Sequence, residues 1–140
     1  MQIAHEVVLS QRSRRSDRWG SGQFGAPRGR RTHAGIDIEA FAGEQVMSPI
    51  DGNVVREALP YPNDTTYRGV LIVGTGEWAG YEVKIFYVLG HFCGTVHAGD
   101  VIGTAQDLSR KYPGITNHIH LQVRRLGNIL RPEELFQSCF

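Results

Sequence analysis

The fold is decided by the stretch GVLIVGTGEWAGYEVKIFYVL, residues 69–89. It contains two runs rich in β-branched and aromatic side chains, residues 69–73 and 81–89, and the segment between them holds three glycines. Such side chains favour strands, and glycine permits the tight turn that joins two strands. The stretch therefore predicts a β-hairpin.

Short apolar runs separated by turn residues continue on both sides of this hairpin. Residues 36–38 and 119–123 alternate between apolar and polar side chains, as strands do. Asp51-Gly52 indicates a second hairpin, between residues 45–49 and 53–56. The 17 glycines add many turn positions, so the chain is predicted to be mainly β and antiparallel, as a sandwich or a barrel.

Little helix is predicted. Residues 107–112 are expected to form one helical turn that ends before Pro113-Gly114. Residues 131–136 are expected to form a short helix, with a proline in its first turn and acidic residues near its N-terminus.

The length of 140 residues predicts one domain. We divide the chain into an irregular, arginine-rich N-terminal arm, residues 1–32, and a β domain, residues 33–140. A formal net charge of +1 gives no overall attraction to nucleic acid, which is therefore not an expected partner. The arginines of the arm are interpreted as a solvated surface, with attraction to a polyanion such as a cell wall as the alternative. They are Arg12, Arg14, Arg15, Arg18, Arg28, Arg30 and Arg31.

The sequence contains no apolar run of roughly 18 residues, so no membrane span is expected. Residues 1–10 lack the charged and apolar regions of a signal peptide. Cys93 and Cys139 fit no metal-binding spacing, and the sequence leaves open whether they form a disulfide. We expect a monomer.

The chemistry is concentrated around two histidine motifs. His118 and His120 are two residues apart on a predicted strand, so their imidazoles point to the same face. His33 and Asp37 supply an imidazole and a carboxylate at the start of another strand, with Gly35 allowing a bend between them. Both groups are ordinary zinc ligands, and three protein ligands with an open fourth position are typical of a catalytic zinc. Exposed strand histidines in a metal-free β domain are the alternative.

These motifs and their order resemble the lysostaphin/LytM-type zinc metallopeptidases, which cleave peptide cross-bridges of bacterial peptidoglycan. The likeness covers roughly residues 33–125 and is carried by residues 33–38, 43–46, 48–55 and 96–103 and by His118-Ile119-His120. Three further segments are similar to the branch that contains the leukocyte cell-derived chemotaxins; they are residues 17–24, 84–87 and 112–115. The resemblance implies a compact antiparallel β-sheet or sandwich domain of the duplicated hybrid motif type, with a groove over the metal.

The resemblance also implies roles for individual residues. His33, Asp37 and His120 become the zinc ligands, and His118 becomes the catalytic residue that orients or deprotonates the attacking water. Three further residues flank the implied groove as candidate substrate contacts: Tyr87, Tyr112 and Asn117. For the two tyrosines, a packing role is the alternative.

The sequence departs from the family pattern at two positions. Leu89 stands where these peptidases carry a second catalytic histidine, and leucine cannot transfer a proton. A bulge at Gly90 would bring His91 to the site as a replacement, whereas a surface-loop histidine is the alternative. Gln122 stands where the family usually has a glutamate that holds a ligand imidazole.

Two functions follow from these expectations. The first is a zinc-dependent peptidoglycan endopeptidase, a bacteriolytic and antimicrobial hydrolase such as a phage endolysin. It would act at the cell wall or outside the cell and stay in the cytoplasm until released. The second is a non-catalytic zinc protein of the chemotaxin type that binds a receptor or a cell-wall ligand.

Overall fold

The computed structural model describes residues 3–14, 17–22, 25, 27–28, 31–32, 34–90 and 93–137. Almost all of its regular structure is strand, with one 3-10 turn and one short α-helix. The elements in chain order are β1 (Pro27–Arg28), β2 (Arg31–Thr32), β3 (Ile36–Glu39), β4 (Gln45–Met47), β5 (Gly52–Glu57), β6 (Gly69–Gly74), η1 (Gly76–Trp78), β7 (Tyr81–Phe86), β8 (Val88–Gly90), β9 (Gly94–Val96), β10 (Val101–Ala105), β11 (His118–Arg125), β12 (Asn128–Leu130) and α1 (Glu133–Phe136).

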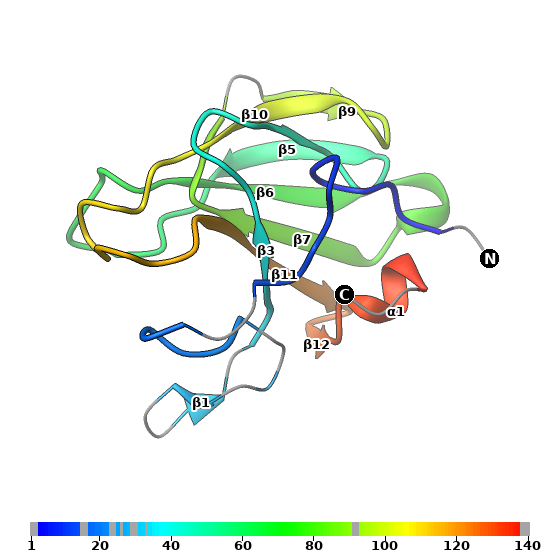
Figure 1. Cartoon of the computed structure of the whole chain (residues 1–140). Helices are drawn as coiled ribbons and strands as arrows, with labels where there is room; N and C mark the ends of the chain where they lie inside the picture. The colour runs from blue at the N-terminus through cyan, green and yellow to red at the C-terminus, as the bar shows by residue number, and fades with distance from the viewer. Residues whose placement is uncertain are drawn as a thin grey trace.

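A seven-stranded antiparallel sheet forms the main layer, with the order β12-β11-β7-β6-β5-β9 and with β3 paired to β11. Figure 1 shows its long strands β5, β6, β7 and β11 side by side. The predicted hairpin of residues 69–89 is confirmed as β6 and β7, in which Val70 pairs with Ile85. Alternate side chains along these strands, such as Ile72 and Val83, are fully buried, which is the period-2 pattern of a sheet with one face on the core.

A three-stranded sheet, β4-β10-β8, supplies the other side of the core. Its residues Val46, Val88 and Ile102 are fully buried and belong to the same apolar cluster as Ile85 and Ile119 of the large sheet. The fold is therefore a mainly β, antiparallel structure with one core, and the short C-terminal helix α1 covers one end of it (Figure 1).

Two local predictions are wrong. Asp51-Gly52 does not join a hairpin, because β4 pairs with β10, whereas β5 pairs with β6 and β9. The run of residues 81–89 is not one strand, because Tyr87 has a φ of 67° and the chain passes there from the large sheet to the small one.

The two segments predicted to be helical form a single turn and a short helix, respectively. Residues 107–112 form turns in which Tyr112 N–H donates to the carbonyl of Leu108, a single helical turn without a helix. The C-terminal helix is confirmed as α1, and Pro132 caps it. None of the described helices is long and apolar enough to cross a membrane.

The described part of the N-terminal segment contacts the β domain at several positions. Val7 and Val8 are fully buried in the core, and the backbone N–H of Ala4 donates to the carbonyl of Leu135. Ser13 forms a β-bridge with Ile38. The division of the chain at residues 32 and 33 stays a prediction.

Candidate metal and active site

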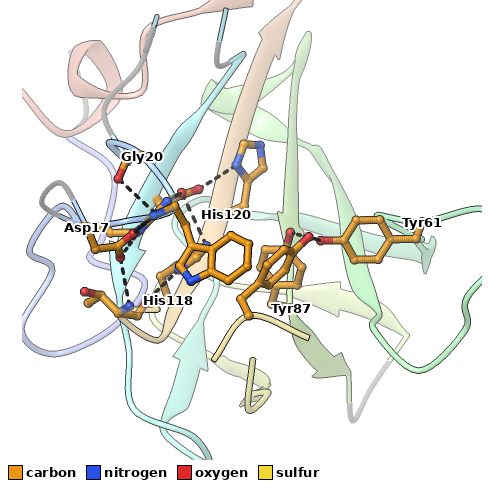
Figure 2. Close-up of polar contacts among 11 residues, drawn as sticks. Asp17, Gly20, Tyr61, Tyr87, His118 and His120 are labelled. Atoms are coloured by element: carbon orange, nitrogen blue, oxygen red, sulfur yellow. Dashed lines mark hydrogen bonds and ion pairs between the residues drawn. The ribbon is translucent and has the colours of Figure 1, made fainter. Parts of the chain in front are cut away.

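Strand register builds the centre of the site. Asp37 of β3 and Phe86 of β7 lie directly opposite His120 of β11, one on each side. Directly opposite residues on one face have their side chains in contact. The Nδ1 atom of His120 is 3.0 Å from Oδ1 of Asp37, and the Phe86 ring stacks on the imidazole with centroids 5.6 Å apart. Figure 2 shows a dashed line from the His120 ring to a carboxylate oxygen.

His118 lies two residues earlier on the same face of β11, as the sequence predicts. Its Nε2 atom is 3.4 Å from Oδ2 of Asp37, so one carboxylate lies between two imidazoles. Its Nδ1 atom is 2.8 Å from the carbonyl oxygen of Thr116. Because a carbonyl only accepts, Nδ1 carries the hydrogen and the neutral ring presents its lone pair at Nε2.

Burial favours the neutral form of the His118 imidazole. The residue is 4% exposed, and burial lowers the pKa of its imidazole, although the charge of Asp37 acts in the opposite direction. Tyr87 packs edge-on against the ring, with centroids 5.5 Å apart. A neutral buried imidazole with a lone pair directed at the site can accept a proton.

Arg14 reaches Asp37 from the N-terminal segment. Its Nη1 donates to Oδ2 of Asp37 at 2.8 Å, its Nη2 donates to Oδ1 of Asp17 at 2.7 Å, and Nη2 also donates to the carbonyl of Gly20. Arg14 is 2% exposed. The hydrogen bonds from Arg14 hold the pKa of Asp17 well below its usual range. Figure 2 shows Asp17 and Gly20 gathered at this guanidinium.

The burial of Arg14 corrects the interpretation of the arm arginines as a solvated surface. Arg12 and Arg18 are exposed as expected. Arg14 is buried because two carboxylates and a carbonyl supply the partners that a buried guanidinium requires.

Three tyrosines lie beside the histidines in the same pocket. The hydroxyl of Tyr61 is hydrogen-bonded to the hydroxyls of Tyr87, at 2.9 Å, and of Tyr112. Figure 2 shows the hydroxyls of Tyr61 and Tyr87 pointing toward one another. Burial raises the pKa of Tyr87 to about 12 and raises that of Tyr61 further, so both hydroxyls stay protonated at neutral pH.

These residues enclose a pocket of about 340 Å³. Its polar wall consists of Arg14, Asp37, His118 and His120. Its aromatic wall consists of Trp19, Tyr61, Phe86, Tyr87 and Tyr112. Convergent polar groups in a concave aromatic pocket are typical of a ligand-binding site.

Two of the three predicted zinc ligands, Asp37 and His120, have donor atoms at a spacing that suits zinc. Two ligands of a tetrahedral zinc bonded at about 2.0–2.2 Å are about 3.3 Å apart. The separation of 3.0 Å between His120 Nδ1 and Asp37 Oδ1 is close to this value. Among the described residues, no three His, Cys, Asp or Glu side chains form a group that could hold a metal ion. The third predicted ligand, His33, lies outside the described residues, so the full ligand set stays a prediction.

The other predicted site residues divide into three groups. Tyr87 and Tyr112 line the pocket. Asn117 does not line the pocket, contrary to the prediction. Its side chain instead forms hydrogen bonds with the backbone of Ala40, Gln106 and Leu108 and holds three segments together. His91 lies outside the described residues, as does Cys139, the possible partner of the exposed Cys93.

Leu89 lies in β8 opposite Thr104 and is 46% exposed. It follows Tyr87 by two residues, but the positive φ of Tyr87 breaks the strand alternation between them. The position where a second catalytic histidine was expected therefore belongs to the small sheet, whereas Tyr87 stays at the pocket.

Sequence reasoning missed several residues of the pocket, chiefly Arg14, Trp19, Tyr61 and Phe86. Phe86 had a usable signal, because residues 84–87 match the chemotaxin branch. Arg14 and Tyr61 had none, since they come from irregular segments and reach the site through Asp37 and Tyr112, which are far away in the sequence.

Comparisons with known proteins identify the family of the chain. The chain matches the family model described as peptidase family M23 over residues 31–132. Leukocyte cell-derived chemotaxin-2 of Mus musculus is 34% identical over 111 residues, which make up 78% of this chain and 71% of the chemotaxin.

Solved structures share the fold. The antimicrobial peptidase lysostaphin from Staphylococcus simulans superposes with a TM-score of 0.67 and 14% identity, covering 98% of this chain and 55% of that one. A zinc-containing peptidase from Vibrio cholerae superposes with a TM-score of 0.64 and 18% identity, covering 99% of this chain and 41% of that one. The predicted lysostaphin-like fold is confirmed.

Proposed function

Because the chain belongs to peptidase family M23, we propose that it is a zinc metalloendopeptidase that hydrolyses peptide cross-bridges of bacterial peptidoglycan. One observation carries the proposal: the Asp37 carboxylate lies between the imidazoles of His118 and His120, and all three residues line a pocket of about 340 Å³. This arrangement combines metal-ligand chemistry with a neighbouring base. The site of action would be the cell wall.

The residues have separate roles in this proposal. Asp37 and His120, with His33 as the third predicted ligand, would hold the zinc. When bound there, zinc polarises a peptide carbonyl and makes water more acidic. His118 takes the proton from the attacking water at Nε2, because its Nδ1 hydrogen is held by Thr116.

The surrounding residues position these groups. Arg14 fixes Oδ2 of Asp37 and leaves Oδ1 facing His120. Phe86 stacks on the His120 ring and covers one of its faces. The protonated hydroxyls of Tyr61 and Tyr87 are hydrogen-bond donors in the same pocket as the histidines, where they can bind substrate oxygen atoms.

The test is digestion of purified peptidoglycan by protein loaded with one equivalent of zinc. Each hydrolysed peptide bond releases one new amino group and one new carboxylate, so amine release is measured together with turbidity. His118→Ala is expected to lose at least about 100-fold in rate, the usual contribution of a general base. His97→Ala is the matched control, because His97 is exposed and lies in a turn.

A second candidate function has its own support. The identity to chemotaxin-2 and the displacement of Leu89 into the small sheet favour a non-catalytic zinc protein that binds a receptor or a wall fragment. Zinc-loaded protein that releases no amino groups, yet loses stability when a chelator removes the metal, would replace the peptidase proposal by this one.

A further inference from the structure

The sheet face that carries the histidines continues past them. Along β11 the same face presents His120, Gln122 and Arg124, and along β7 it presents Phe86, Lys84 and Glu82, paired in that order. Each pair of opposite residues forms a row across the two strands. Successive rows on this face are about 7 Å apart, since a strand rises about 3.4 Å per residue.

The second row extends across two more strands. Lys84 lies opposite Leu71 of β6, and Leu71 lies opposite Arg56 of β5. These residues enclose a shallow cavity of about 120 Å³, which we call the basic trough. Its lining is Arg56, Leu71, Glu82, Lys84, Gln122 and Arg124.

The trough holds three positive side chains and one negative side chain, Glu82. Among the described residues none of the three cations forms a salt bridge. Arg56 and Arg124 donate to the backbone carbonyls of Glu57 and Gly127, which are neutral. The Lys84 ammonium lies over the ring of Phe86, 5.8 Å from its centroid. The three cations outnumber the one carboxylate, so the trough keeps a net positive charge.

Phe86 connects the trough to the candidate active site. One face of its ring stacks on His120, and Lys84 also lies over the ring. Phe86 lines the 340 Å³ pocket and Lys84 lines the trough, so a chain leaving the pocket along β7 and β11 passes directly onto the cations.

We propose that the basic trough is a subsite for a carboxylate group carried by the peptide substrate. An extended peptide advances about 7 Å in two residues, which is the spacing between the rows. A peptide whose reacting bond lies beside His120 therefore places the residue two positions away over Lys84 and Gln122, and the residue four positions away near Arg124. This inference rests on the proposed peptidase function and adds its substrate class: a peptide with a free carboxylate rather than a neutral one.

The roles within the trough follow from side-chain chemistry. Lys84 and Arg124 donate charge-assisted hydrogen bonds to the carboxylate. Gln122 offers both a donor and an acceptor to the peptide backbone. Glu82, beside Arg124, disfavours a second carboxylate at the far end of the trough.

The test is binding of two pairs of fluorescently labelled alanine-based peptides to zinc-free protein, measured by fluorescence polarisation. One pair differs in a free C-terminus against a C-terminal amide, and the other in an internal glutamate against glutamine. We expect the carboxylate member of at least one pair to bind about five- to ten-fold more tightly, with the preference falling as salt rises. The pair that shows the preference identifies the source of the carboxylate.

Variants locate the preference on the protein. Lys84→Gln and Arg124→Gln are each expected to reduce it several-fold and to change binding of the neutral peptides less than about two-fold. Arg110→Gln, at an exposed turn position, removes the same charge elsewhere and should leave the preference unchanged. Equal circular dichroism spectra establish that the variants are folded.

The outcomes separate this inference from the proposed function. No measurable binding, no preference in either pair, or an unchanged preference in Lys84→Gln overturns the subsite. A preference that depends on Lys84, in protein that fails to cut peptidoglycan, keeps the subsite and rejects the hydrolytic function.

Discussion

Replacing Arg14 with alanine tests whether the N-terminal segment supports the candidate site electrostatically. The Arg14 side chain is 3% exposed and the Asp37 side chain 4%, so their ion pair is buried. Removing one partner of a buried pair usually costs about 3–5 kcal/mol. We expect a loss of roughly 3 kcal/mol in the free energy of unfolding, at the lower end, because Asp37 keeps both histidines and Asp17 is 15% exposed.

The assay is urea denaturation of zinc-free protein, so that metal binding does not mask the loss. Arg12→Ala is the matched control, because Arg12 is exposed and lies two residues away; its effect should stay within about 0.5 kcal/mol. The loss of stability in Arg14→Lys should lie between the losses in Arg14→Ala and Arg12→Ala, because one ammonium cannot replace a guanidinium that donates to two carboxylates. Equal midpoints for Arg14→Ala and Arg12→Ala would show that the buried pair contributes no stability, and the reasoning would fail.

Two further predictions concern the walls of the site. Gly35→Ala would place a methyl carbon in steric conflict with the Leu121 carbonyl oxygen and 2.9 Å from Nε2 of His120, so we expect a loss of about 1–3 kcal/mol in the free energy of unfolding, measured by urea denaturation. An unchanged midpoint would mean that β11 does not approach Gly35 this closely. The pKa of Tyr87 is raised from 10.0 to about 12 in the folded chain, so this tyrosine loses its proton at a lower pH in the unfolded chain. The free energy of unfolding should therefore fall as pH rises between these two pKa values. Tyr87→Phe should flatten this fall, as measured by urea midpoints across the window, and an unaltered slope would remove Tyr87 as its cause.

The sequence predicts the parts of the site that depend on local periodicity. His118 and His120 converge on one point because strand alternation is a property of neighbouring residues. The same reasoning places Ile119 and Leu121 in the core, where both are fully buried.

The register of two strands that are far apart in the sequence cannot be predicted from the residues of either strand alone. The row of Asp37, His120 and Phe86 joins residues separated by more than thirty positions in the chain. Asp51-Gly52 illustrates the opposite error, since a dipeptide typical of hairpins sits between strands that belong to different sheets. A local sequence pattern predicts that the chain turns, but contacts between distant parts of the chain determine which strands pair.

The change of sheet at Tyr87 had no signal at all. Non-glycine residues seldom adopt a positive φ, so neither composition nor periodicity predicts one. Its effect on the site is large, because it separates Tyr87 at the pocket from Leu89 on the small sheet.

The contact between Arg14 and Asp37 bears on how this protein can be shortened. The match to the family model begins at residue 31, whereas the cation beside Asp37 is supplied by residue 14. A truncated version starting at residue 31 would retain Asp37, His118 and His120 but would expose a carboxylate that the whole chain keeps neutralised. The region that matches the family model and the region that neutralises Asp37 therefore have different boundaries, and a minimal fragment with an intact site should begin before Arg14.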